Sequence, residues 1–482
     1  MPVSRILGLD KENVMSTYAL SRLGLLAVLV TLTACGGSSS SGGLGVNPVS
    51  SAINFVDWTW VGGSDSPSQL GSYGSKGVAD LNNMPQALEG AMSWTDNNGN
   101  LWLFGGGGVG SEDFNSLWRY DGTYWIWMNG TTAANEQSVY GAFGVADPSY
   151  FPSARQYSAT WTDAAGNLWL FGGYVRTDDI SGNTDASNDL WKYEISTNQW
   201  ALMNGVVTEG ATLPQPGVYG AGPSNYPGAR WSAASWIDSA GNFWLFGGKG
   251  YDSGGAYGRL NDLWKFDGTN WTWVSGSNVM EETGTYGTPN MADAANVPGA
   301  RQGAISWVDG SDNLWLFGGL GIDSSGSFGD LNDMWMFDGT DWIWKSGSNM
   351  AGQPGNYGTA GSLGSGVPGA RRYGVSWKDS SGNLWMFGGR GYDATATFGE
   401  LNDLWKFEPV NRQWAWMSGT NAVDQQGIYG TLGISDPDNV PVARDVAVSW
   451  TNASGLWMFG GQGVDSIGFP GYYNDFWKLQ PL

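Results

Sequence analysis

The clearest pattern of apolar and polar positions is a four-part unit, best seen in residues 230–273. It begins with RWSAASWI, which predicts a strand, and continues through a polar turn, DSAGN, into FWLF, which predicts a strand buried on both faces. After Gly-Gly and a loop, NDLWKF predicts a third strand, and a DGTN turn leads to WTW, whose alternating aromatics predict a fourth. We therefore expect four antiparallel strands in each unit.

This unit occurs repeatedly along the chain. An apolar segment ending in Gly-Gly is found six times, at intervals of 67 to 75 residues. A period of this size indicates a propeller or another repeat array. The six glycine pairs are Gly105-Gly106, Gly172-Gly173, Gly247-Gly248, Gly318-Gly319, Gly388-Gly389 and Gly460-Gly461.

The two ends of the repeat array complement each other. The last repeat stops after its third strand, at Trp477 to Leu482. Residues 54–62 (NFVDWTWVG) have the pattern of a fourth strand without the three that precede it. We expect this N-terminal strand to complete the last repeat, which would leave no strand edge exposed.

Gly-Gly, a loop, Asn-Asp followed by an apolar residue and an aromatic, and a later Trp resemble the kelch repeat, as in the central domain of galactose oxidase-like proteins. The resemblance covers about residues 53–482. It implies an all-β fold: a six-bladed kelch-type β-propeller of residues 51–482, with four antiparallel strands per blade. The repeats are longer than the usual kelch length of about 50 residues, and the excess lies in the loops.

The first 50 residues have a different pattern. The apolar run 23–34 is too short to span a bilayer and fits a signal peptide, residues 1–34, whose true start is expected at Met15. Leu-Thr-Ala-Cys resembles a bacterial lipobox, so Cys35 is the expected lipidation site, followed by a Gly/Ser tether to residue 50. The alternative is a buried structural cysteine. In bacterial lipoproteins Asp after the Cys favours the inner membrane, so Gly36 points to the outer membrane.

Composition narrows the possible functions. The chain has 77 Gly, 30 Trp, no His and a formal net charge of −22, so nucleic acid is not an expected partner. The copper site of galactose oxidase-like enzymes needs histidines, so that chemistry is contradicted. No metal site is assigned. Ca²⁺ binding by loop aspartates is one interpretation, and turn stabilisation is the favoured one. These residues are Asp252, Asp323, Asp393 and Asp465.

Nearly all tryptophans fall at equivalent strand positions in the repeats. Such regular placement favours packing between neighbouring strands over ligand binding. Only Trp231 lies outside this pattern, and we keep it as a candidate ligand contact.

The long loops lie between the second and third strands and between repeats, so they share one face, where binding is expected. Pro-x-Ala-Arg begins the first strand of five repeats, and its arginine is expected at the mouth of the central channel. One interpretation is a ring of anion-binding arginines. The favoured one is an ion pair with the Asp of Asn-Asp, because repeat one has Leu88 and Ser116 at these two positions. The candidate ligand-binding residues are Arg155, Arg230, Trp231, Arg301, Arg371, Tyr373 and Arg444.

These features favour a surface-anchored binder of a protein or glycan, attached to the membrane through its lipid anchor. No catalytic residue and no cofactor are assigned. The alternative is a sugar-modifying enzyme of epimerase or lyase type that uses Arg and Tyr at the channel mouth. A structural envelope protein is a second alternative. Loops that are similar in every repeat argue against a single asymmetric active site.

Overall fold

The computed structural model describes residues 56–176, 184–205, 215–220, 224–464 and 468–480. The chain divides into two units, residues 1–52 and 53–482, and every described residue belongs to the second. The described residues form strands and loops without a helix, so none of their segments is a candidate membrane-spanning helix. The expected all-β class is confirmed. Cys35 and the segments predicted as signal peptide and tether lie outside the described residues.

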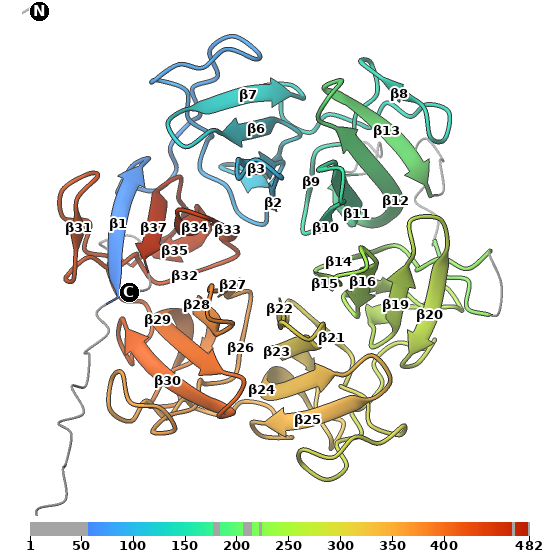
Figure 1. The fold of residues 1–482 in the computed structure, drawn as a ribbon, viewed down its shortest axis with the longest axis vertical. Helices are drawn as coiled ribbons and strands as arrows, with labels where there is room; N and C mark the ends of the chain where they lie inside the picture. Colours follow the sequence, from blue (N-terminus) through green and yellow to red (C-terminus); the bar gives the residue numbers. More distant parts are fainter. Residues whose placement is uncertain (1–55, 177–183, 206–214, 221–223, 465–467, 481–482) are drawn as a thin grey trace, which may run out of the picture. The chain divides into compact units, whose positions relative to one another are not determined.

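In the described part of the chain, six rows of four antiparallel strands follow the six repeats (Figure 1). The rows of repeats one to three are β2 (Met92–Thr95), β3 (Leu101–Phe104), β6 (Leu117–Tyr120), β7 (Trp125–Asn129); β10 (Ala159–Thr162), β11 (Leu168–Arg176), β12 (Thr184–Glu194), β13 (Gln199–Asn204); and β15 (Ala234–Ile237), β16 (Phe243–Phe246), β19 (Leu263–Phe266), β20 (Trp271–Ser275). Those of repeats four to six are β22 (Ile305–Val308), β23 (Leu314–Ile322), β24 (Phe328–Phe337), β25 (Trp342–Ser346); β27 (Val375–Lys378), β28 (Leu384–Tyr392), β29 (Phe398–Glu408), β30 (Gln413–Ser418); and β33 (Val448–Asn452), β34 (Gly455–Phe459), β37 (Phe476–Gln480), β1 (Asp57–Gly62).

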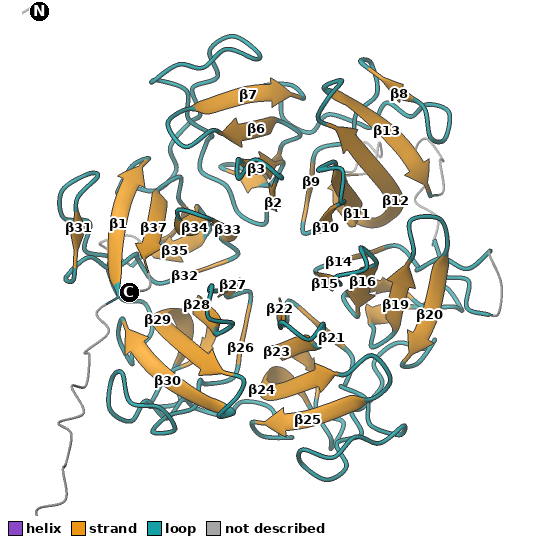
Figure 2. Cartoon of the chain, in the orientation of Figure 1, coloured by secondary structure: helices purple, strands orange, loops and turns teal. Residues whose placement is uncertain are grey.

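Shorter strands extend these rows (Figure 2). Those that begin with the repeated arginine are β9 (Arg155–Gln156), β14 (Arg230–Trp231), β21 (Arg301–Gln302), β26 (Arg371–Arg372) and β32 (Arg444–Asp445). In repeats three and six they continue into β17 (Lys249–Tyr251), β18 (Tyr257–Arg259), β35 (Gln462–Val464) and β36 (Pro470–Tyr472), and in repeat one, which lacks this arginine, β4 (Gly107–Gly108) pairs with β5 (Glu112–Asp113). Two others, β8 (Ala146–Asp147) and β31 (Ser435–Asp436), pair with the outer strands β13 and β1.

The core lies between neighbouring rows. The apolar segment of each second strand, such as Leu101–Phe104, is buried at all four positions, because each row packs against another on both faces. In the first strands buried and half-buried residues alternate, as in Met92–Thr95. The indole Nε1 of Trp94 donates to the backbone carbonyl of Trp169, at 2.9 Å, and that of Trp450 donates to Trp102, at 2.9 Å. Tryptophan packing between rows is therefore confirmed.

The N-terminal strand joins the last row. β1 pairs antiparallel with β37, with Trp58 opposite Leu479, which is the pairing expected from the sequence. The Trp58 side chain is 1% exposed and packs edge-on against Trp477 and Phe387. Residues separated by the whole length of the array thus share one sheet.

Six backbone hydrogen bonds form a closed cycle that takes one residue from each repeat. Each N–H donates to the carbonyl of the residue in the preceding repeat, over 2.8 to 3.1 Å, and Gly90 donates to Val446. All six residues have φ between 50° and 63°. This region suits glycine and is unusual for a β-branched residue such as Val446, and such strain often marks functional sites. The six residues are Gly90, Tyr157, Ser232, Gly303, Tyr373 and Val446.

The first strands are also neighbours in cyclic order: β2, β10, β15, β22, β27, β33 and β2 again. Figure 1 shows them innermost, with the later strands of each row farther out. An all-β fold of small antiparallel sheets with this order is compatible with a β-propeller.

Candidate functional site

The five predicted arginines are buried and paired with the Asp of Asn-Asp in their own repeat. In repeat four, Arg301 Nη1 donates to Asp333 Oδ1 over 2.7 Å and Nη2 donates to Oδ2 over 2.8 Å. Tyr286 and Trp335 also donate to this carboxylate, over 2.6 and 2.7 Å. The other pairs are Arg155–Asp189, Arg230–Asp262, Arg371–Asp403 and Arg444–Asp475.

The structure shows the arginines in ion pairs, which is the favoured one of the two interpretations from the sequence. The Nε and Nη1 groups of Arg301 also donate to the carbonyls of Gly299 and Gly318, so backbone and carboxylate together hold the guanidinium. A ligand-binding role for the five arginines stays a prediction, and it would require the pair to open.

The residue after each arginine varies among the repeats: it is Gln in repeats two and four, and Trp, Arg and Asp in repeats three, five and six. Neighbouring residues of a strand point to opposite faces, so this side chain points away from the interface between rows in which the arginine is buried. In repeat one the equivalent residue is Glu89, whose backbone bridges to Gly107. We call these residues the central positions: Glu89, Gln156, Trp231, Gln302, Arg372 and Asp445.

Two tyrosines of the backbone cycle meet beside the central positions. Tyr157 and Tyr373, from repeats two and five, have ring centroids 5.8 Å apart, and Trp231 lies 5.6 Å from Tyr157. A Cβ at Gly90 would come within 2.5 Å of the Tyr157 ring, and one at Gly303 within 2.4 Å of Tyr373. Glycine at these two positions therefore makes room for the two rings. Trp231 and Tyr373, both candidates from the sequence, lie in this cluster.

Ionisable side chains surround the tyrosines. Arg372 Nη1 contacts both oxygens of Asp330, at 2.9 and 3.1 Å, and Arg390 lies 3.5 Å from Glu400. Glu89 and Asp445 are in no ion pair with another described residue.

Several of these carboxyl groups are held closer to the neutral form than usual. Burial raises the pKa of Glu89 to about 7, and burial together with the Glu89 carboxylate raises that of Asp445 to about 7. Burial and the Asp445 carboxylate raise the pKa of Glu400 to about 9, and burial raises that of Asp330 to about 6 although Arg372 opposes it.

Three buried acceptor atoms here have no hydrogen-bond partner among the described residues: Gln302 Oε1, Glu400 Oε2 and Asp445 Oδ1. Their residues are only 5%, 6% and 5% exposed. The amide of Gln302 is fixed from its other side, because Nε2 donates to Tyr373 Oη over 2.7 Å. Unpartnered buried polar atoms are rare in folded proteins and need an explanation, for which a ligand donor is one. We call Glu89, Tyr157, Trp231, Gln302, Tyr373, Glu400 and Asp445 the central cluster.

Aromatic side chains stand near the central cluster on strands that lead into and out of the long loops. Tyr257 accepts a hydrogen bond from Trp231 Nε1 over 2.7 Å. The exposed Phe328 stacks on Arg259, at 4.1 Å, and Phe398 lies 5.5 Å from Arg372 and from Arg390. Exposed aromatic faces beside polar groups are typical of ligand-binding surfaces.

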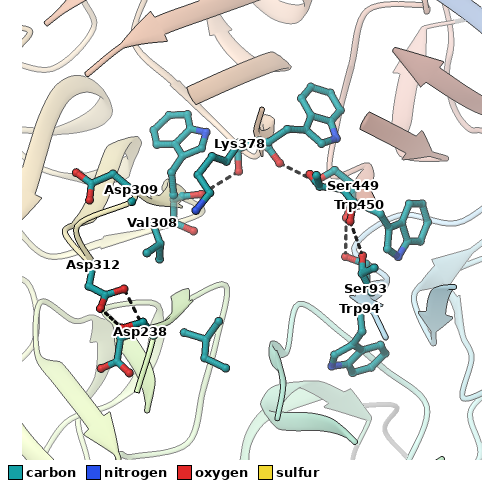
Figure 3. A pocket seen from close by; sticks show the side chains of 18 residues that line it. Ser93, Trp94, Asp238, Val308, Asp309, Asp312, Lys378, Ser449 and Trp450 are labelled. Carbon is teal, nitrogen blue, oxygen red and sulfur yellow. Dashed lines mark hydrogen bonds between the residues drawn. The ribbon is translucent and has the colours of Figure 1, made fainter. Parts of the chain in front are cut away.

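A separate cavity of about 620 Å³ lies between the first strands and the short turns (Figure 3). Its wall hydroxyls are engaged: Ser93 donates to the carbonyl of Ser449 over 3.2 Å, and Ser376 donates to that of Ser306 over 2.9 Å. Asp312 accepts hydrogen bonds from Ser239. These hydroxyl and carboxylate groups of the cavity wall are therefore already hydrogen-bonded within the protein.

The loop aspartates stabilise turns where they are described. Asp323 Oδ1 accepts the backbone N–H groups of Ser325 and Ser327, over 2.8 and 2.9 Å, and Asp252 and Asp393 make the equivalent bonds. Asp465 lies outside the described residues. No group of His, Cys, Asp or Glu side chains within the described ranges could hold a metal ion.

Sequence reasoning missed most of the central cluster, because it concentrated on what the repeats share. The inference that similar loops oppose an asymmetric site overlooked the central positions, where nearly every repeat has a different residue. The feature of the sequence that could have indicated these positions is the variation of the residue directly after the repeated Arg. No model of a known protein family matches the sequence, and a search of curated proteins gives no match either.

The raised pKa values predict that stability falls as pH rises. In the unfolded chain these carboxyls have pKa values near 4, so between about pH 4 and pH 7 the folded protein binds more protons than the unfolded chain. The free energy of unfolding therefore decreases as the pH rises through this range. We expect the melting temperature of residues 48–482 to drop by several degrees from pH 5 to 8. Glu89→Gln with Asp445→Asn should flatten this slope, whereas the exposed Asp438→Asn should not. An equal slope in the double variant would contradict the assignment.

Proposed function

We propose that residues 51–482 form a six-bladed kelch-type β-propeller, closed by β1, that binds a protein or glycan through its long-loop face. The propeller is supported by the six rows, the cyclic order of the first strands and the closed cycle of backbone hydrogen bonds. In a closed propeller the loops on one face converge around one axis, so residues from distant repeats can contact a single ligand.

The central cluster is the proposed centre of the binding surface. The observation that carries the proposal is the set of unpartnered, buried acceptors on Gln302, Glu400 and Asp445. Ligand hydroxyl or amino groups would donate to Gln302 and Asp445, and the carboxyl of Glu400, whose pKa near 9 keeps it protonated at pH 7, could also donate to the ligand. The faces of Trp231 and Phe398 would cover the apolar sides of a sugar ring. This combination of polar groups beneath aromatic ones favours a glycan.

A glycan array and a pull-down with residues 48–482 test this proposal. Trp231→Ala and Phe398→Ala should each weaken binding roughly tenfold, because a sugar face that stacks on either ring would lose contact area. Tyr124→Ala is the matched control, since Tyr124 lies in the turn between β6 and β7, at the short-turn end. Binding that survives Trp231→Ala and Phe398→Ala but not the control would reject the long-loop face.

A second candidate is a sugar-modifying enzyme of epimerase or lyase type. It is favoured by Glu89 and Asp445, whose pKa values near 7 suit proton transfer. An activity screen against sugars and polysaccharides distinguishes the two candidates. Turnover that disappears in Glu89→Gln while the ligand still binds would replace the binder proposal with the enzyme.

We also propose that Cys35 is lipidated and anchors the protein in the outer membrane. The support is the Leu-Thr-Ala-Cys segment with the Gly/Ser stretch after it. Cys35→Ser should move the protein from the membrane to the soluble fraction and abolish incorporation of labelled fatty acid, with Ser38→Ala as the control. Labelling that persists in Cys35→Ser would refute the anchor.

A further inference from the structure

We propose that the ligand of the central cluster is an extended glycan chain of three or more sugar residues, which lies along exposed aromatic rings of three successive repeats. The inference rests on the proposed function and deepens it by assigning the length and shape of the ligand. The rings belong to Tyr257, Phe328 and Phe398, which are 37%, 54% and 38% exposed. We call these three residues the aromatic track.

The track residues occupy one equivalent position in repeats three, four and five. Each begins the strand that follows a long loop, and each lies opposite the last residue of the preceding strand. In repeats three and five that opposite residue is a tyrosine, Tyr251 or Tyr392, whose ring packs on the track ring at 4.9 or 5.1 Å. The connecting loops are those whose turns the loop aspartates stabilise. The three rings are thus exposed but held in place from behind.

The track is continuous from one repeat to the next. Arg259 of repeat three packs on the ring of Phe328 in repeat four, 4.1 Å from its centroid. Asp330 lies two residues after Phe328, on the same face of the strand, and accepts a hydrogen bond from Arg372 of repeat five over 2.9 Å. Arg372 in turn lies 5.5 Å from the ring of Phe398. Polar side chains therefore alternate with the rings and connect them.

Both ends of the track contact the central cluster. At one end Trp231 Nε1 donates to Tyr257 Oη over 2.7 Å. At the other end Phe398 lies 5.5 Å from Arg390, which pairs with Glu400 of the cluster. A ligand seated at the cluster can therefore continue onto the track without leaving the surface.

The other three repeats do not continue the track. In repeats two and six the equivalent residues are Thr184 and Pro470, opposite Arg176 and Val464. In repeat one the hairpin of β4 and β5 is shorter and has no aromatic side chain. The track therefore covers one side of the long-loop face, which gives the surface a direction that the repeats alone do not have.

The spacing of the rings requires a chain. Packed sheets lie about 10 Å apart, so rings on neighbouring rows are farther apart than one sugar ring can cover. Sugar rings combine apolar faces, which stack on aromatics, with hydroxyl groups that both donate and accept hydrogen bonds. The buried atoms without a partner among the described residues are of both kinds: the donors Arg259 Nε and Arg390 Nε, and the acceptors Gln302 Oε1 and Asp445 Oδ1. Hydroxyl groups suit such a mixture, which selects neither a cation nor an anion.

A glycan array that carries several linkage types, each with two, four and six sugar residues, tests the inference on residues 48–482. Calorimetry then gives the affinities of the series that binds. We expect its six-residue member to bind at least roughly tenfold more tightly than its two-residue member, because it covers more of the rings.

Phe328→Ala is the decisive variant, because Phe328 is outside the central cluster. It should remove most of the gain with chain length and leave the affinity for the two-residue glycan unchanged. Its melting temperature should equal that of the wild type, since the ring is exposed. Phe143→Ala is the matched control: Phe143 is 57% exposed and lies in the loop that bonds to β13, away from the track.

Equal affinity for the two-residue and six-residue glycans, or an unchanged length dependence in Phe328→Ala, would overturn the extended chain. If no member of any series binds, the inference is also overturned, and the pull-down then decides whether the ligand is a protein. The proposed function fails differently, because Trp231→Ala and Phe398→Ala would then leave binding unchanged at every length. If both glycans bind equally and Trp231→Ala weakens both, the long-loop face is retained and only the chain is rejected.

Discussion

Replacing Arg301 with Leu is expected to lower the free energy of unfolding by about 3–5 kcal/mol, the usual effect of breaking a buried ion pair. The side chains of Arg301 and Asp333 are both 0% exposed, so the remaining carboxylate could not be solvated. Asp333→Ser alone should be similarly destabilising, because it leaves the guanidinium with its two backbone acceptors only.

Repeat one shows the compensated alternative. Leu88 and Ser116 occupy the two positions, both are buried, and Ser116 accepts a hydrogen bond from Trp118 over 3.1 Å. Arg301→Leu combined with Asp333→Ser reproduces this arrangement and should recover most of the loss. Urea unfolding of the wild type, both single variants and the double variant gives the coupling energy. Effects that simply add would show that the two side chains are energetically independent.

Deleting residues 53–62 is expected to destabilise the protein by more than the loss of Trp58 alone, for which about 3–5 kcal/mol is typical of a buried Trp. β1 supplies Trp58 to a core cluster and provides the partner strand of β37. Without it, β37 becomes an exposed edge that can pair with another molecule. We expect a lower melting temperature and oligomers in size-exclusion chromatography.

Adding the missing strand back separates this effect from general damage. A synthetic peptide of residues 53–64 should restore the melting temperature of the deletion variant and return it to the monomer. The same peptide with Trp58→Ala is the matched control and should be much less effective, because it retains the backbone pairing but not the buried ring. A deletion variant as stable as the parent, or equal rescue by both peptides, would show that β1 does not complete the last row.

The strands, their order within a repeat and the pairing of β1 could be predicted from the sequence, because they depend on short-range patterns. FWLF and its equivalents have no polar position to face water, and the DSAGN and DGTN turns fix where each strand ends. The Arg–Asp pair was also predictable, since repeat one lacks both partners together.

The central cluster was decided by the tertiary structure. Glu89, Gln302 and Asp445 are far apart in the sequence, and none of them on its own indicates a binding site. They come to lie around Tyr157 and Tyr373 because six equivalent backbone segments bond into one cycle, which these two tyrosines join at positive φ. Burial then raises the carboxyl pKa values and leaves acceptor atoms without partners. The repeating pattern thus determined the strands and their rows, whereas the non-repeating chemistry of the site depends on contacts that only the assembled rows create.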